Sequence, residues 1–207
     1  MADNDVKVEA EVKTPSKKKF NKNSIVWCVC ILVIIGSVAG ALLGAINVVT
    51  YVDPDEAIIS KITGIYESAT DIKKDDSYVI NGGAYGSVTS VFTYNVDGDD
   101  MLCYYAVGRG AYDGTIELLF FIMKEEGIVD NVSVYSSGET SAVGGKVLKV
   151  LDELRGFELP SLKNYGQATS SDAQDMEYYV SGATVTTKGV TNALRACAYA
   201  YNNKVEG

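Results

Sequence analysis

The sequence contains no histidine among its 207 residues. Histidine supplies much of general acid/base catalysis, so its absence excludes Ser/His triads, haem attachment through C-x-x-C-H and most catalytic zinc sites. Any chemistry must therefore come from carboxylates, hydroxyls, thiols or a bound cofactor.

Basic residues are also in short supply. The chain has 18 Lys and Arg against 27 Asp and Glu, which gives a net charge of −9. A nucleic-acid surface needs a basic face. The composition therefore predicts that nucleic acid is not a partner.

Cysteine is sparse, with four residues in the whole chain, and their spacing fits no zinc or iron–sulfur pattern. Cys28 and Cys30 lie in a long apolar segment. Cys103 and Cys197 are predicted to be small buried side chains, with a disulfide between them as the alternative if that domain is extracellular.

One apolar run has no charged side chain at all, namely residues 24–49, "SIVWCVCILVIIGSVAGALLGAINVV". As a helix it would span about 39 Å, against a hydrocarbon core of about 30 Å. A cleavable signal peptide is the alternative, but its apolar core is usually only about 7–15 residues long. We therefore predict a retained transmembrane helix at 24–49.

The charges on either side of this run predict its orientation. Lysines precede it and acidic residues follow it, which places the N-terminus in the cytoplasm by the positive-inside rule: Lys17, Lys18, Lys19 and Lys22, then Asp53, Asp55 and Glu56. Residues 1–23 are predicted to be a disordered cytoplasmic tail. Residues 50–207 are predicted to form an extracytoplasmic domain of a single-pass protein of the cell membrane.

Glycine recurs every four residues in the apolar run, at Gly36, Gly40 and Gly44. Such a stripe lies on one helix face and lets a second helix approach closely in lipid. Chance is the alternative, because glycine is common in membrane helices. The stripe favours a partner helix, and so a subunit rather than a lone tethered domain.

The pattern after residue 50 predicts an α+β domain, an antiparallel β-meander packed with helices. Pro54 begins a helix with Asp53 as its cap. Residues 87–136 alternate strands rich in β-branched and aromatic residues with short glycine-bearing turns, which predicts four strands. Further helices are predicted at about 143–155 and 187–203.

The stretch "VSGATVTTKGV", residues 180–190, packs small and hydroxylated residues just before the last predicted helix. A helix N-terminus exposes unpaired N–H groups and a positive dipole end, so it can bind a phosphate without a basic side chain. We expect Thr186 or Thr187 to be the N-cap, with Thr184 just before it. An ordinary helix cap after a tight turn is the alternative interpretation.

The letters "SGATVT" resemble the flavinylation motif of the FMN-binding domain family. The resemblance implies that FMN is joined through its phosphate, as a phosphoester, to the hydroxyl of Thr184. It also implies a set of further cofactor-binding residues around that position: Ser181, Gly182, Ala183, Thr186 and Thr187.

A second segment, "GETSAVGGK" at 138–146, is similar to the family's E-T-P-G-x-G, which lies near the flavin. Glu139, Thr140 and Gly144 match, and Ser141 replaces the proline. Glu139 and Thr140 are therefore added to the expected cofactor-binding residues. A third segment, "GAYDGTI" at 110–116, loosely matches the family's G-x-x-G-x-I.

One position departs from the family. An acidic residue usually stands three positions before the Ser/Thr of the motif, and here that residue is Tyr178. Glu177 and Asp175 are close enough to substitute. If the flavin transferase needs that carboxylate, this departure bears directly on whether Thr184 is modified.

Members of the family include the G subunit of the Rnf complex and the C subunit of the sodium-pumping NADH:quinone reductase, and the length is closer to the former. The resemblance implies a covalent-FMN electron carrier in a translocase that couples ferredoxin:NAD electron transfer to ion transport. Its partners would be other membrane subunits and a flavin transferase, and three tyrosines are candidate ring contacts: Tyr85, Tyr112 and Tyr135.

Two other functions stay open from the sequence. One is a stand-alone membrane-anchored extracellular flavoprotein, acting as a reductase or an electron relay. The other is a structural subunit whose motif is not flavinylated. A threonine hydrolase is excluded, because Thr184 has neither a histidine nor a free N-terminal amine to activate it.

Overall fold

The computed structural model describes residues 22–51, 53–75, 77–78, 85–139, 144–168 and 177–203. The chain divides into two compact units, Met1–Val52 and Asp53–Gly207. The predicted tail lies outside the described residues, apart from its last two positions.

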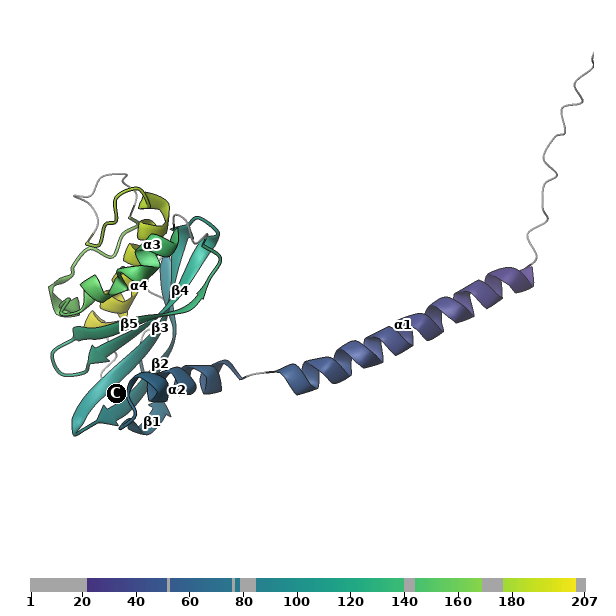
Figure 1. Ribbon diagram of the computed structural model, residues 1–207, viewed down its shortest axis with the longest axis horizontal. Helices are drawn as coiled ribbons and strands as arrows, with labels where there is room; N and C mark the ends of the chain where they lie inside the picture. The colour runs from purple at the N-terminus through teal and green to yellow at the C-terminus, as the bar shows by residue number, and fades with distance from the viewer. Residues whose placement is uncertain are drawn as a thin grey trace, which may run out of the picture. The chain divides into compact units, whose positions relative to one another are not determined.

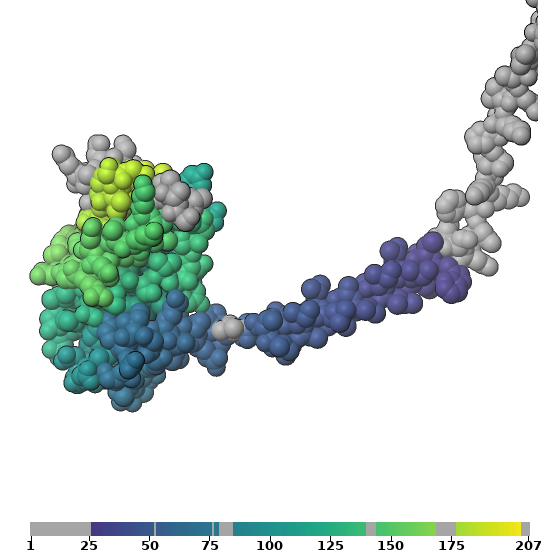
Figure 2. Space-filling model, in the orientation of Figure 1, coloured from purple at the N-terminus to yellow at the C-terminus, as the bar shows by residue number. Residues whose placement is uncertain are grey.

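The described residues of the first unit form a helix, α1 (Lys22–Thr50). Among all the residues that the structure describes, there is one helix long and apolar enough to cross a membrane, and it includes this segment from Val26 onward. Its side chains are exposed from Val26 onward, including the large apolar ones, as the space-filling view shows for the purple-to-blue helix (Figure 2). The structure thus has the predicted apolar helix.

The second unit begins with helix α2 (Pro54–Ile65), capped as predicted by Asp53, whose carboxylate accepts a hydrogen bond from the Asp55 N–H at 2.9 Å. A five-stranded antiparallel sheet follows, with the strands in sequence order. The strands are β1 (Thr70–Lys74), β2 (Gly86–Val96), β3 (Asp99–Ala111), β4 (Gly114–Met123) and β5 (Ile128–Ser137). The predicted α+β class and meander are confirmed (Figure 1).

Strand β1 was not predicted from the sequence. Its residues, "TDIKK", are mostly exposed and charged, and it lies at the edge of the sheet beside β2. Charged side chains are a common feature of edge strands because they discourage pairing with other chains. The strand is therefore poorer in the β-branched and aromatic residues that identified the other four.

The sheet buries a core on each face, because successive side chains of a strand point to opposite sides. In β3, Leu102 and Tyr104 belong to the core under helix α4, whereas Cys103 between them belongs to the core under α2. Both cores are part of the second unit, and α4 and α2 cover opposite faces of its sheet.

Three short helices and one long helix follow the sheet. They are α3 (Gly144–Lys149), the 3-10 turns η1 (Leu151–Leu154) and η2 (Leu159–Ser161), and α4 (Thr184–Asn202). The single helix predicted at 143–155 is thus an α-helical turn and a half followed by 3-10 geometry. The last helix begins at Thr184 and not at residue 187.

Helix α4 lies unusually close to the sheet at three glycines. A Cβ built on Gly108 of β3 would stand 1.8 Å from the Gly189 carbonyl oxygen, and one on Gly86 of β2 would stand 2.3 Å from the Asn192 carbonyl oxygen. Gly189 itself has Ala111 and Ile116 within 3.0 Å of the same position. Only glycine allows this approach of helix backbone to strand backbone.

Cys103 and Cys197 are both fully buried free thiols. Burial raises the pKa of each thiol well above its ordinary value. The interpretation as small buried side chains is confirmed, and the alternative of a disulfide is not.

Candidate functional site

The site begins at the turn that leads into α4. Gly182 has a φ of 79°, which is the left-handed region that glycine adopts without strain. Ala183 is the N-cap, and no side chain caps the helix. Thr184 is therefore the first helical residue.

The predicted cap, Thr186 or Thr187, is wrong. The Thr187 N–H already donates to the Ala183 carbonyl at 3.0 Å, and the Thr187 hydroxyl donates to the same oxygen at 2.9 Å. Thr187 is thus a buried member of the first full helical turn. Its hydroxyl therefore already has two partners, the Ala183 carbonyl and the Val180 N–H at 3.4 Å.

The residues of the motif differ in their exposure. Ser181 and Gly182 are exposed, Thr184 is half-buried, and Ala183 is buried with Thr186 and Thr187. The Thr184 hydroxyl lies 3.5 Å from the Tyr179 hydroxyl. Among the motif's threonines described, Thr184 therefore offers the most accessible hydroxyl.

A pocket of about 320 Å³ opens beside Thr184. It brings together residues from all three segments that the sequence singled out, 110–116, 138–146 and 180–190. The yellow-green residues that follow residue 177 lie at the surface of this unit (Figure 2). The lining residues are Tyr112, Glu139, Gly144, Gly182, Ala183, Thr184, Val185 and Thr186.

Glu139 connects the segments around the pocket by hydrogen bonds. One carboxylate oxygen accepts the Tyr112 N–H at 2.8 Å, and the other accepts the Thr186 hydroxyl at 2.5 Å. A Cβ on Gly144 would stand 2.2 Å from the second oxygen, so glycine is required there. Glu139 thus links the β3–β4 turn, the start of α3 and α4. Thr140 lies outside the described residues.

The electrostatics of the pocket depend on backbone groups. None of the described residues that line it is Lys or Arg, and Glu139 carries a negative charge. The first N–H groups of an α-helix have no partner within the helix, and the dipole favours an anion there. A phosphate would therefore be met by the unpaired N–H groups of the first turn of α4. The Glu139 carboxylate, which lines the same pocket, is engaged by two donors.

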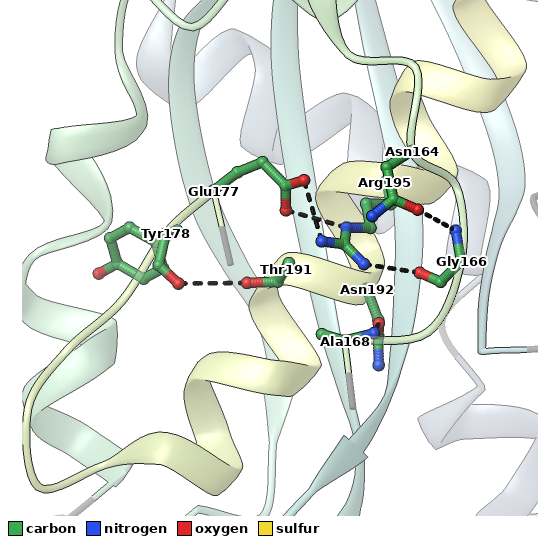
Figure 3. Close-up of polar contacts among 8 residues, drawn as sticks. All are labelled: Asn164, Gly166, Ala168, Glu177, Tyr178, Thr191, Asn192 and Arg195. Atoms are coloured by element: carbon green, nitrogen blue, oxygen red, sulfur yellow. Dashed lines mark hydrogen bonds and ion pairs between the residues drawn. The ribbon is translucent and has the colours of Figure 1, made fainter. Parts of the chain in front are cut away.

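Tyr178, at the position where the family carries an acid, is part of the core. Its ring is 4% exposed, and its hydroxyl donates to the Val147 carbonyl of α3 at 3.1 Å. Burial raises the pKa of Tyr178, which keeps this donor protonated. Glu177 forms an ion pair with Arg195 (Figure 3), and Asp175 lies outside the described residues.

The three candidate tyrosines are in different surroundings. Tyr112 is a pocket-lining residue with 74% of its surface exposed. Tyr85 precedes β2 and is also exposed. Tyr135 packs against Tyr105 at a ring distance of 4.7 Å, in contact with the core under α2. Of the three, the structure brings only Tyr112 into the pocket.

Two residues near Thr184 were missed by the sequence analysis. Val185 lines the pocket and is 46% exposed, and Tyr179 places its hydroxyl near that of Thr184. An exposed valine in the first turn of a helix gives no signal in the sequence. Val185 lines a pocket only because other segments of the chain complete that pocket.

These features define an α+β domain with a pocket at the N-terminus of a long helix. Residues 111–199 match the family model described as the FMN-binding domain. The matched range contains every residue that lines the pocket. No curated protein and no solved structure matches the chain. The match supports FMN as the cofactor of this domain.

Proposed function

We propose that this protein is a membrane-anchored flavin electron carrier whose FMN is joined through its phosphate to Thr184. We further propose that it is a subunit of an Rnf-type complex, which couples electron transfer between ferredoxin and NAD to ion translocation. The observation that carries the proposal is the position of Thr184. It is the first residue of α4, half-buried, beside a pocket within the range that matches the FMN-binding domain.

The pocket residues fit a phosphate-bearing group. The Thr184 hydroxyl would carry the phosphate, and the first N–H groups of α4 would offset its charge. A Cβ at Gly182 would meet nothing within 4 Å, so the approach to Thr184 is open on that side. When bound, FMN supplies the redox chemistry, and the protein supplies binding, orientation and electrostatics.

The other lining residues would orient the group. Glu139 fixes the Tyr112 backbone through one oxygen and the Thr186 hydroxyl through the other. Tyr112 and Val185 present exposed apolar surface at the same pocket. An aromatic ring system placed there would be covered by these two side chains and would exclude water from that face.

A covalent link suits a domain outside the cytoplasm, where a lost cofactor could not be rebound from a cytoplasmic pool. The link needs a flavin transferase as a partner. The test is the intact mass of the purified protein from cells that contain such a transferase. The proposal expects the mass of FMN less one water, and the unmodified mass would overturn it.

The alternative of an unflavinylated structural subunit is favoured by one observation. Tyr178 is a core residue and Glu177 is paired with Arg195, so neither presents the carboxylate that the family carries before its motif. In-gel fluorescence of the denatured protein distinguishes the two functions, because only a covalent flavin remains with the chain.

The outer unit is predicted to lie outside the cytoplasm, from the lysines before α1 and the acidic residues after it. Protease added to intact cells or to right-side-out vesicles should degrade the unit that begins at Asp53. Degradation only after lysis would show that this unit lies on the cytoplasmic side. The reason given above for a covalent link would then no longer hold.

Gly40 is predicted to lie in a contact with a helix of another subunit. Gly40→Leu should reduce co-purification of partner subunits while leaving membrane insertion unchanged. Apart from its chain neighbours and the backbone of its own helix, no described atom lies within 4 Å of a Cβ at Gly40, so the added side chain meets no other part of the described protein there. Ala45→Leu, which lies away from the glycine stripe on the helix, is the matched control. Equal co-purification of partner subunits with both variants would mean that the spacing of the glycines arose by chance.

A further inference from the structure

One turn of α4 carries three buried polar side chains that all bond to segments outside the helix. Thr191, Asn192 and Arg195 are each no more than 2% exposed. Figure 3 shows them directed toward the chain that precedes α4 and toward residues 164–168. Buried polar groups in a helix that otherwise packs apolar residues need partners, and here each has them.

Arg195 makes the most demanding of these contacts. Two of its nitrogens, Nε and Nη2, each donate to a different oxygen of Glu177 at 2.9 Å, and Nη1 donates to the Gly166 carbonyl at 2.9 Å. The side chains of Arg195 and Glu177 are 3% and 16% exposed. This planar two-bond arrangement fixes orientation as well as distance.

The neighbouring side chains fix the same region. The Thr191 hydroxyl donates to the Tyr178 carbonyl at 3.2 Å. The Asn192 amide donates to the Arg109 carbonyl at 2.7 Å and accepts the Ala168 N–H at 2.9 Å. Glu177 and Tyr178 are thus attached to α4 immediately before the segment that carries the motif.

The segment between these anchors has few bonds of its own. The Ala183 N–H donates to the Val180 carbonyl at 3.2 Å, and the Val180 N–H lies 3.4 Å from the Thr187 hydroxyl. Ser181 and Gly182 are exposed. The conformation of this exposed turn therefore depends on its two ends, which are α4 on one side and the Glu177 and Tyr178 attachments on the other.

We propose that Glu177 and Arg195 are a positioning pair that holds residues 177–183 in the conformation in which Thr184 accepts the flavin. This inference rests on the proposed function. The pair acts through the backbone of the turn, and neither side chain lines the pocket beside Thr184. The carboxylate at 177 would thus serve the fold of the acceptor segment and not contact with the transferase.

Glu177→Gln removes the charge of one partner and breaks the charge-assisted two-bond contact with the buried Arg195 guanidinium, which is unfavourable. The turn should then be ordered for only a fraction of the time. An acceptor that is competent for only a fraction of the time shows an apparent affinity reduced by that fraction. We expect at least about a tenfold rise in the KM of the transferase for this protein, with kcat unchanged.

Hydrogen exchange of the unflavinylated full-length protein in detergent measures how often the turn opens, and it needs no flavin. In Glu177→Gln, the amides of Val180 and Ala183 should exchange at least about tenfold faster, while amides of the central strands keep their protection. The matched control is Asp152→Asn, which removes an exposed ion pair with Arg155 in the same unit and should change neither quantity. Arg195→Lys, which keeps the charge but not the two-bond geometry, should show both effects in smaller degree.

If Glu177→Gln does not fold, with strand amides also unprotected, the same two measurements on Arg195→Lys decide the question. Unchanged exchange at Val180 and Ala183 would overturn the positioning pair. A fall in kcat with normal exchange would also overturn it, because Glu177 would then act directly in the transferase complex. A wild-type protein that accepts no flavin would contradict the proposed function, while the exchange measurement would still test the pair.

Discussion

Thr184→Val should prevent covalent attachment of the flavin and leave the second unit, Asp53–Gly207, folded. Valine nearly preserves the volume of threonine but has no hydroxyl to form the phosphoester. Thr184 is half-buried, and among the described residues its hydroxyl has one hydrogen-bond partner, the Tyr179 hydroxyl at 3.5 Å. The loss of the hydroxyl should therefore cost little stability. Intact mass and yellow colour retained through acid precipitation are the measurements, made on protein from cells with the transferase.

Thr186→Val is the matched control, since it removes a hydroxyl two residues away in the same turn. It deletes the donor to one Glu139 oxygen, which should lower the free energy of unfolding by about 1–3 kcal/mol. Some of the Thr186→Val protein should still gain the mass of FMN less one water. If Thr184→Val keeps the flavin mass, the attachment site is another residue. If wild type lacks it, Tyr178 is the first position at which to look for the reason.

Gly108→Ala should destabilise the second unit, Asp53–Gly207, more than the addition of a methyl group at any other described glycine. The added Cβ would stand 1.8 Å from the Gly189 carbonyl oxygen and 2.9 Å from the Ala193 backbone nitrogen. Both are backbone atoms of α4, so no side chain can rotate away and the helix must shift from the sheet. We expect a loss of about 3 kcal/mol or more in the free energy of unfolding, measured by urea denaturation of the full chain in detergent.

Gly64→Ala provides the comparison. Gly64 lies in the exposed part of α2, and a Cβ there would meet nothing within 4 Å. Alanine favours helix over glycine by about 1 kcal/mol, so this variant should be as stable as wild type or slightly more so. Equal stability of the Gly108 and Gly64 variants would mean that α4 is not seated against β3 at this point.

Most elements of the fold could be predicted from the sequence, and the elements that were missed or misplaced show why. Strands β2 to β5 have apolar and aromatic side chains and end at turns such as Asp97-Gly98, where both residues have positive φ, as a tight hairpin turn requires. Strand β1 has charged residues at an edge and no apolar alternation. The start of α4 was misplaced by three residues because the threonine hydroxyls suggested a cap, whereas the Gly182 turn and the Ala183 backbone begin the helix.

The candidate site was predictable only where a local motif marks it. The segments around Glu139 and Thr184 were identified by resemblance, and the structure brings them to one pocket. The bond from the Tyr112 N–H to Glu139 joins residues far apart in the chain, and no local pattern reports it. The burial of Tyr178 likewise depends on α3, which the sequence alone does not place beside it.

The placement of α4 has a consequence for the order of events during synthesis. This helix covers one face of a sheet whose strands all precede it in the chain, and its partners on β2, β3 and β4 are far away in sequence. Pairings of such long sequence separation form late. The meander must therefore emerge with an apolar face uncovered, which is a state prone to aggregation and to capture by chaperones. Thr184 begins the helix that covers this face, so the proposed acceptor site would form only once the whole domain has been released. Attachment of the flavin would then report on completed folding, and a transferase acting only on the closed domain would leave misfolded copies without cofactor.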